Sequence, residues 1–190
     1  MTIIELVVVL SIFAVLSMVT LFNSNNFQRK VDIRNLATDI ASQIVQAQNS
    51  SLSGLFPTQF HPVNWKPAYG VFFAVQPTQG ADSKDFIYFT DTNSNNLFDN
   101  IACSGECINK YTITKGNYIS SIDAFYTNST TSNLSNLTIV FTRPNSSPVF
   151  HATTFNNGLT VSYVQITIID ATGKNTTKIQ IYNSGRVQIS

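Results

Sequence analysis

The sequence contains few charged residues, cysteines and histidines, and the low charge content argues against nucleic-acid binding. Aspartate, glutamate, lysine and arginine make up 11% of the 190 residues, whereas soluble domains average about 25%. The formal net charge of +1 gives no basic surface of the kind that nucleic acid requires. The polar surface is therefore built from Asn, Ser, Thr and Gln, and it is neutral and hydrogen-bonding.

The chain also lacks the sequence motifs of common enzymes. It has no nucleophile elbow, Walker loop or Rossmann glycine pattern. Its two histidines are far apart in sequence, and we expect His61 in a loop and His151 near the end of a strand. We therefore expect no enzymatic activity, although a Ser/His/Asp site built from distant residues stays open.

Only two cysteines are present, Cys103 and Cys107, with three residues between them. A structural zinc site usually needs four ligands, and a thioredoxin-like motif needs C-x-x-C in a βαβ unit. A local disulfide explains the pair best and indicates an extracytoplasmic domain. A pair of free thiols is the alternative.

The first 22 residues form one apolar run. As a helix with a rise of about 1.5 Å per residue they span roughly 33 Å, enough to cross a bilayer core. The run has neither the basic start nor the small-residue cleavage site of a secretory signal, and the first positive residue is Arg29. We assign residues 1–28 to a transmembrane or filament-core half of a helix. The polar exceptions in the run are Thr2, Glu5, Ser11, Ser17 and Thr20.

Glu5 is the residue that a plain membrane anchor does not explain. A carboxylate in an apolar helix costs several kcal/mol unless it is paired. The nearest fixed positive group is the α-amine of Met1, in the same chain or in a neighbouring copy shifted along the axis, where the pair would set the register between subunits. The alternative is a first-turn glutamate that reaches the lipid headgroups and favours the positive end of the helix dipole.

The segment Thr2-Ile3-Ile4-Glu5-Leu6-Val7-Val8-Val9-Leu10 resembles the mature N-terminus of type IV pilins and type II secretion pseudopilins. The resemblance implies cleavage by a prepilin peptidase after a glycine, methylation of the new N-terminus, and assembly roles for Met1, Thr2 and Glu5. The usual first residue of the family is Phe, whereas this chain has Met1. A start four residues before the glutamate favours a processed chain.

Helical periodicity continues beyond the apolar run. Residues 23–26 read Asn-Ser-Asn-Asn and have weak helix preference, so we expect local unwinding there. Residues 29–56 then form an amphipathic helix half that needs a sheet to cover its apolar face and ends near residues 52–54. Its predicted apolar stripe is Ile33, Leu36, Ile40, Ile44 and Ala47.

Residues 57–190 form a β-rich head. Period-two patterns separated by turn residues predict a mostly antiparallel β head, so the fold class is α+β, with one long N-terminal helix over about 1–53 packed on that head. The resemblance to type IV pilins implies that this arrangement is a pilin fold. We expect exposed loops at 129–135 and 145–148. The predicted strands are Tyr69–Val75, Phe86–Thr90, Tyr111–Thr114, Tyr118–Phe125, Leu137–Phe141, Gln165–Asp170, Lys178–Tyr182 and Val187–Ile189.

The C-terminal Ser184-Gly185-Arg186-Val187 resembles the end of minor pilins and pseudopilins whose sheet closes with a Gly-Arg turn. Some of those relatives bind DNA through several arginines in this tail. Here only Arg186 is present, so no specific nucleic-acid site is expected.

Two surface features remain. In the loop from Asp91 to Asp99, the side chains of Asp91, Asn93, Asn95 and Asp99 and the Leu97 carbonyl offer the oxygen ligands that calcium prefers, although the glycine and final glutamate of an EF-hand are missing. A hairpin loop of Asx turns is the alternative.

The chain also contains N-x-S/T sequons, the acceptor pattern for N-glycosylation. Glycosylation of a secreted filament is one explanation, and chance in a chain rich in Asn, Ser and Thr is the other. The sequons begin at Asn49, Asn128, Asn133, Asn136, Asn145 and Asn175.

Together these features favour a structural subunit of an extracellular type IV pilus-like filament, a helical homo-oligomer anchored in the inner membrane before the pilus machinery assembles it. Adhesion, motility and DNA uptake are all functions of such filaments. One alternative is a minor pilin or pseudopilin that primes a pilus, secretion or DNA-uptake machine. Another is a β-domain binding protein anchored by one helix, which would tolerate replacement of Glu5 by leucine.

Overall fold

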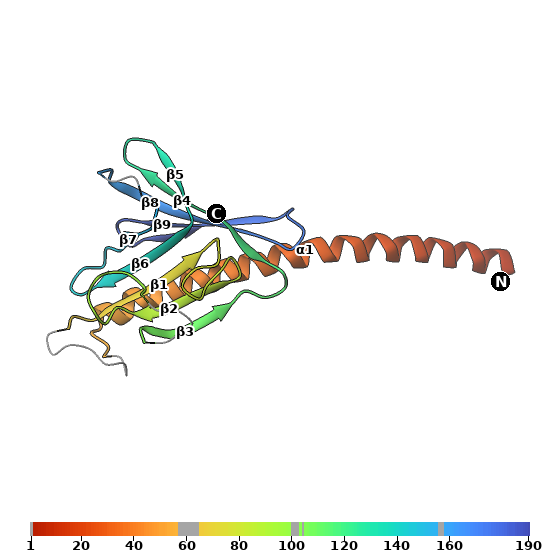
Figure 1. Ribbon diagram of the computed structural model, residues 1–190. Helices are drawn as coiled ribbons and strands as arrows, with labels where there is room; N and C mark the ends of the chain where they lie inside the picture. The colour runs from red at the N-terminus through yellow and green to blue at the C-terminus, as the bar shows by residue number, and fades with distance from the viewer. Residues whose placement is uncertain (1, 57–64, 100–102, 104, 156–157) are drawn as a thin grey trace.

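The computed structural model has an α+β fold, with one helix and ten strands among the residues that it describes (Figure 1). The structure describes residues 2–56, 65–99, 103, 105–155 and 158–190, and the side chains of 19–25 also lie outside the description. The elements are α1 (Ile3–Leu52), β1 (Ala68–Ala74), β2 (Asp85–Thr90), β3 (Cys107–Thr112), β4 (Tyr118–Tyr126), β5 (Thr131–Leu134), β6 (Asn136–Thr142), β7 (Val149–His151), β8 (Val161–Ile169), β9 (Thr176–Tyr182) and β10 (Val187–Ile189).

Helix α1 runs through the Asn-rich segment at 23–26, so the predicted local unwinding is wrong. Residues of weak propensity cost at most about 0.7 kcal/mol each, and an established helix propagates cooperatively past such a short segment. The helix ends beyond Leu52, where Gly54 has a φ of +70° and the Leu55 N–H donates to the Ser50 carbonyl. That C-terminus lies where the sequence predicts it.

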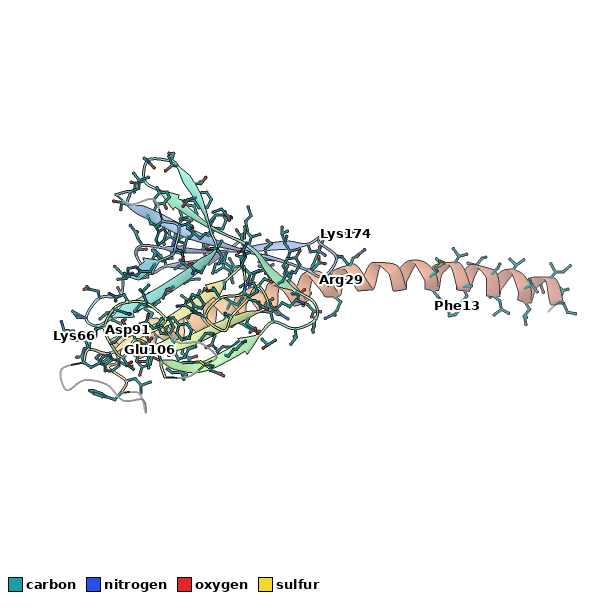
Figure 2. All side chains as sticks on the ribbon, viewed as in Figure 1. Phe13, Arg29, Lys66, Asp91, Glu106 and Lys174 are labelled. Carbon is teal, nitrogen blue, oxygen red and sulfur yellow. A yellow bond between two sulfur atoms is a disulfide. The ribbon has the colours of Figure 1, made fainter. Side chains whose placement is uncertain are left out.

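The second half of α1 packs against the head. Four residues of the predicted apolar stripe, Ile33, Ile40, Ile44 and Ala47, are buried, and Leu36 is half-buried against the same core. Ala37, one position along from Leu36, is also fully buried. The helix contacts β1 and β6 of one sheet and β8, β9 and β10 of the other, and it leaves the head near Arg29 and Lys174 (Figure 2).

The strands form two antiparallel sheets of five strands each. The first has the order β3-β2-β1-β6-β7 and the second the order β10-β9-β8-β4-β5. The α+β class with antiparallel strands is therefore confirmed. One hydrophobic core joins the inner faces of both sheets to the buried face of α1.

Two strands escaped the sequence-based prediction. The segment 129–135, expected to be an exposed loop, contains β5, and the short strand β7 follows the expected loop at 145–148. Strand β5 is polar and largely exposed, and among the described strands it lies at the edge of its sheet, paired with β4. A polar edge strand has no apolar alternation, so hydrophobic periodicity does not detect it. Strand β3 also begins at Cys107, four residues before the predicted start.

Candidate functional site

The first half of α1 projects away from the head and exposes apolar side chains around its circumference (Figures 1 and 2). Phe13, labelled in Figure 2, is 67% exposed. A monomer rarely leaves so large an apolar surface uncovered, because such patches mark interaction sites. The exposed apolar residues of this segment are Ile3, Ile4, Leu6, Val7, Val8, Val9, Leu10, Ile12, Phe13, Val15, Leu16 and Met18. No membrane-crossing helix is found among the residues that the structure describes.

Thr2 and Glu5 meet at the tip of this projecting segment. The backbone N–H of Thr2 donates to Oε2 of Glu5 at 2.7 Å, and the backbone N–H of Glu5 donates to Oγ1 of Thr2 at 3.3 Å. This reciprocal pair is a capping box, which satisfies two backbone donors at the start of the helix. The spacing Thr-x-x-Glu is the sequence signal for this cap. Met1, the proposed amine partner of Glu5, lies outside the described residues.

The cap leaves the Glu5 carboxylate exposed and able to accept further donors. A carboxylate in the first turn also lies at the positive end of the helix dipole. The capping box therefore holds Glu5 in a defined position at the helix tip.

The loop from Asp91 to Asp99 is organised around one buried carboxylate. Asp91 is fully buried and accepts backbone N–H groups from Ser94 at 2.6 Å, Asn95 at 3.3 Å and Asn96 at 2.7 Å. Ser94 and Asn96 have positive φ angles, which fit a tight Asx-turn loop. These bonds account for the loop without a metal ion.

Of the proposed calcium ligands, three side chains converge at the outer end of this loop. The side-chain amides of Asn93 and Asn95 both donate to Oδ2 of Asp99, the former at 2.7 Å. Their Oδ1 atoms accept the backbone N–H groups of Asn95 and Leu97. Those oxygens would have to leave their present donors to bind calcium. The described part of the chain contains no group of three His, Cys, Asp or Glu side chains arranged around a metal position.

Glu106 closes the loop from the side, and sequence reasoning did not identify it. Its Oε1 accepts the N–H and the hydroxyl of Thr92 at 3.0 and 3.2 Å, and its Oε2 accepts the N–H of Asp99 at 3.3 Å. Burial raises the pKa of Asp91 and of Glu106, and each pKa is raised further by a neighbouring carboxylate. The N–H bonds lower both pKa values but do not offset the burial.

These raised pKa values predict that the head becomes more stable on mild acidification. Above its unfolded pKa near 4.5, Glu106 binds more protons folded than unfolded, so unfolding free energy falls as pH rises through this window. Replacing Glu106 by glutamine removes its contribution to that slope. Chemical denaturation in chelator at pH 5 and pH 7 measures the effect. A wild-type slope equal to that of the Glu106→Gln variant would contradict the prediction.

Calcium binding at the Asp91 to Asp99 loop stays a prediction with its own test. Extracellular sites bind calcium with Kd of about 10⁻⁴ to 10⁻³ M, so about 1 mM calcium should stabilise the head by about 0.4 to 1.4 kcal/mol over chelator. Asp99→Asn should erase that gain, because it removes the exposed carboxylate at the outer end. Asp123→Asn, in β4 of the other sheet, is the matched control and should keep the gain. An unchanged melting temperature in chelator would leave the loop as an ordinary Asx-turn connection.

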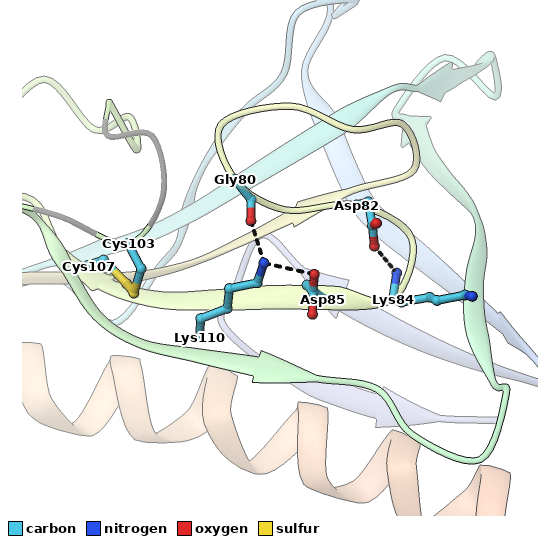
Figure 3. A network of polar contacts seen from close by, with 7 residues as sticks. All are labelled: Gly80, Asp82, Lys84, Asp85, Cys103, Cys107 and Lys110. Carbon is cyan, nitrogen blue, oxygen red and sulfur yellow. Dashed lines mark hydrogen bonds and ion pairs between the residues drawn. A yellow bond between two sulfur atoms is a disulfide. The ribbon is translucent and has the colours of Figure 1, made fainter.

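The structure contains the bond between Cys103 and Cys107, with their Cα atoms 4.8 Å apart (Figure 3). Glu106 directly precedes Cys107, so the disulfide lies next to both Glu106 and the start of β3. Lys110, further along β3, pairs with Asp85 at 2.9 Å and donates to the Gly80 carbonyl at 2.7 Å (Figure 3). Both ends of this edge strand are therefore tied to neighbouring loops or strands.

The C-terminal Gly185-Arg186 pair forms the tight turn between β9 and β10. Gly185 has a φ of +87°, and a Cβ there would lie 2.5 Å from Nε2 of Gln48 and from the Ser146 carbonyl oxygen. The turn thus needs glycine both for its backbone and for its close approach to α1. The Arg186 guanidinium stacks over the Tyr182 ring at 4.0 Å.

Comparison of the chain with protein-family models, with curated proteins and with solved structures found no match.

Proposed function

We propose that this chain is a structural subunit of an extracellular type IV pilus-like filament. The observation that carries the proposal is the projecting half of α1, whose apolar side chains are exposed from Ile3 to Met18 while the second half is packed on the head. One continuous helix with two such halves fits a subunit that has a pilin fold, with its head outside and its helix tip in a shared apolar core.

The energetics favour assembly through this helix. Covering on the order of 1,000 Å² of apolar surface is worth about 25 kcal/mol before the entropic costs of association are subtracted. Copies of the same helix can supply that cover, and a heterologous contact that repeats along an axis generates a helical filament. Before assembly, the same segment would be held in the inner membrane and handed to the pilus machinery.

Glu5 sets the register in this proposal. In an apolar bundle its carboxylate needs a positive partner, and the α-amine of a neighbouring copy fits if the two helices are shifted along the axis. Prepilin peptidase processing and N-methylation would produce that amine. The pair contributes specificity of position, whereas the apolar surface contributes most of the free energy.

A minor pilin or pseudopilin is the second candidate, and the Gly185-Arg186 turn favours it. Such a subunit would be present in few copies and prime a filament rather than build its length. The two candidates share the helix and differ in stoichiometry.

Electron microscopy of sheared surface material, with mass analysis of its subunits, tests the proposal. The expected result is thin filaments in which this chain is present, as the principal component for a major subunit or as a trace component for a minor one. Surface material without this chain, with the protein recovered only as single membrane-bound copies, would contradict both candidates and favour an anchored β-domain.

A further inference from the structure

A polar pocket lies on the face of the first sheet that points away from α1. The Tyr88 hydroxyl donates to Ser50 of α1 at 3.0 Å, and Tyr88 is directly opposite Val71 in the β1–β2 register. Neighbouring residues of a strand alternate between the two faces, so Phe72 lies on the face away from the helix. The pocket has a volume of about 370 Å³, and Phe72 is part of its lining.

The register of the sheet builds the floor of this pocket. Phe72 of β1 is opposite Thr138 of β6, and Thr138 is opposite His151 of β7. Residues directly opposite each other in antiparallel strands share a face, with their Cβ atoms about 5 Å apart. An aromatic ring, a hydroxyl and an imidazole therefore form one row across three strands.

Two loops hold the walls of the pocket in place. Gln79 donates from Nε2 to the Phe98 carbonyl at 2.7 Å, which ties the β1–β2 connection to the loop that follows β2. The Phe98 ring packs on Phe72 with centroids 5.3 Å apart. Asn136 accepts both the N–H and the hydroxyl of Thr153 on its Oδ1, each at 3.0 Å. The pocket is thus formed before any ligand arrives.

The remaining hydrogen-bonding groups of these side chains are available to a ligand. Within the described residues, no intramolecular bond uses Nδ2 of Asn136, Oε1 of Gln79 or the imidazole nitrogens of His151. Donors and acceptors are therefore mixed in the lining, above the buried rings of Phe72 and Phe98. The described lining contains no Asp, Glu, Lys or Arg, so the pocket offers no charged partner to an ionic ligand.

The geometry points to a binding site for a neutral sugar ring of the pyranose class, free or as the terminal unit of a surface glycan. Hydroxyl groups of a pyranose both donate and accept, which matches the mixed set from Asn136, Thr138 and His151. The binding chemistry is independent of the proposed filament. Its biological setting rests on that proposal, because helices in the filament core would turn this face outward.

The test uses the full chain in a zwitterionic detergent that has no sugar headgroup. The probes are methyl β-glucoside, methyl β-galactoside and the methyl glycoside of N-acetylglucosamine, with methyl glucuronide as the charged comparison, and ligand NMR titration gives Kd. A ligand of about a dozen non-hydrogen atoms is expected to bind with Kd of about 1 mM. At least one neutral glycoside should reach that affinity, and the glucuronide should bind at least fivefold more weakly.

Thr138→Val removes one hydroxyl without changing the size of the side chain, and His151→Leu removes the imidazole. Each should weaken binding about fivefold or more, the usual effect of one lost hydrogen bond. Thr177→Val, in a strand of the other sheet, is the matched control and should bind like wild type. No binding of any glycoside at about 20 mM, well above that Kd, would overturn the assignment. Equal binding by both pocket variants, or by the glucuronide, would overturn it as well.

Measuring filament yield distinguishes a failure of the sugar site from a failure of the proposed filament. The pocket variants should assemble filaments normally, because both residues share the sheet face of Phe72, which points away from α1. A pocket without sugar binding in a chain that forms filaments would overturn only the sugar site. Sugar binding by a chain that never assembles would overturn only the filament.

Discussion

Replacing Glu5 by leucine is expected to reduce filament yield at least tenfold while the head stays folded. The substitution keeps the projecting half of α1 apolar and removes only the carboxylate that caps the helix and, in the proposed bundle, pairs with a neighbouring amine. Leaving a buried amine without its partner costs about 3 to 5 kcal/mol, enough to disfavour each addition of a subunit. Quantifying sheared filaments against total subunit measures the effect.

Ser11→Leu is the matched control for this substitution. Ser11 is also a polar residue of the projecting half, but its hydroxyl donates to the Val8 carbonyl of its own helix at 2.8 Å and needs no outside partner. The control should assemble at near wild-type yield. Normal filament yield from Glu5→Leu would remove the register role and favour the single-helix anchor.

Shortening one isoleucine in each half of α1 should separate folding from assembly. Ile40 is fully buried between the sheets, so Ile40→Ala is expected to destabilise the head by about 2 to 5 kcal/mol. Ile12 is 55% exposed on the projecting half, so Ile12→Ala should leave head stability unchanged and reduce assembly instead. Thermal unfolding in detergent and filament yield are measured on both variants.

The two variants together test whether α1 is divided into a half that packs on the head and a half that projects from it. Loss of head stability in Ile12→Ala would mean that the projecting half packs on its own head, contrary to the exposure of its side chains. Unchanged stability in Ile40→Ala would mean that the head folds without the second half of α1. Either outcome would contradict the division of the helix into two halves.

The elements with a regular hydrophobic periodicity could be predicted from the sequence. Apolar residues at helical spacing identified the face of α1 that is buried, and period-two patterns located most of the strands. The short spacing of Cys103 and Cys107 pointed to their disulfide, which the structure contains. These features succeed because each depends on residues close together in the chain.

Features that depend on distant residues were not predictable in this way. The pocket row from Phe72 to His151 exists only through the register of three strands, and no local pattern encodes that register. Glu106 meets the Asp91 loop only through its hydrogen bonds with Thr92 and Asp99, and no local pattern indicates them. The uninterrupted helix at 23–26 shows the opposite case, in which cooperativity along the helix overrides a weak local preference.

A side-chain-resolved electron microscopy map of filaments built by this chain tests the central claim most directly. The account predicts that the projecting halves of α1 fill the filament core, with Glu5 of one copy beside the N-terminal amine of an axially shifted neighbour. It also predicts that the sheet face carrying Phe72 and His151 lies on the outside. A core built from another element, or Glu5 exposed to solvent on the filament surface, would contradict it.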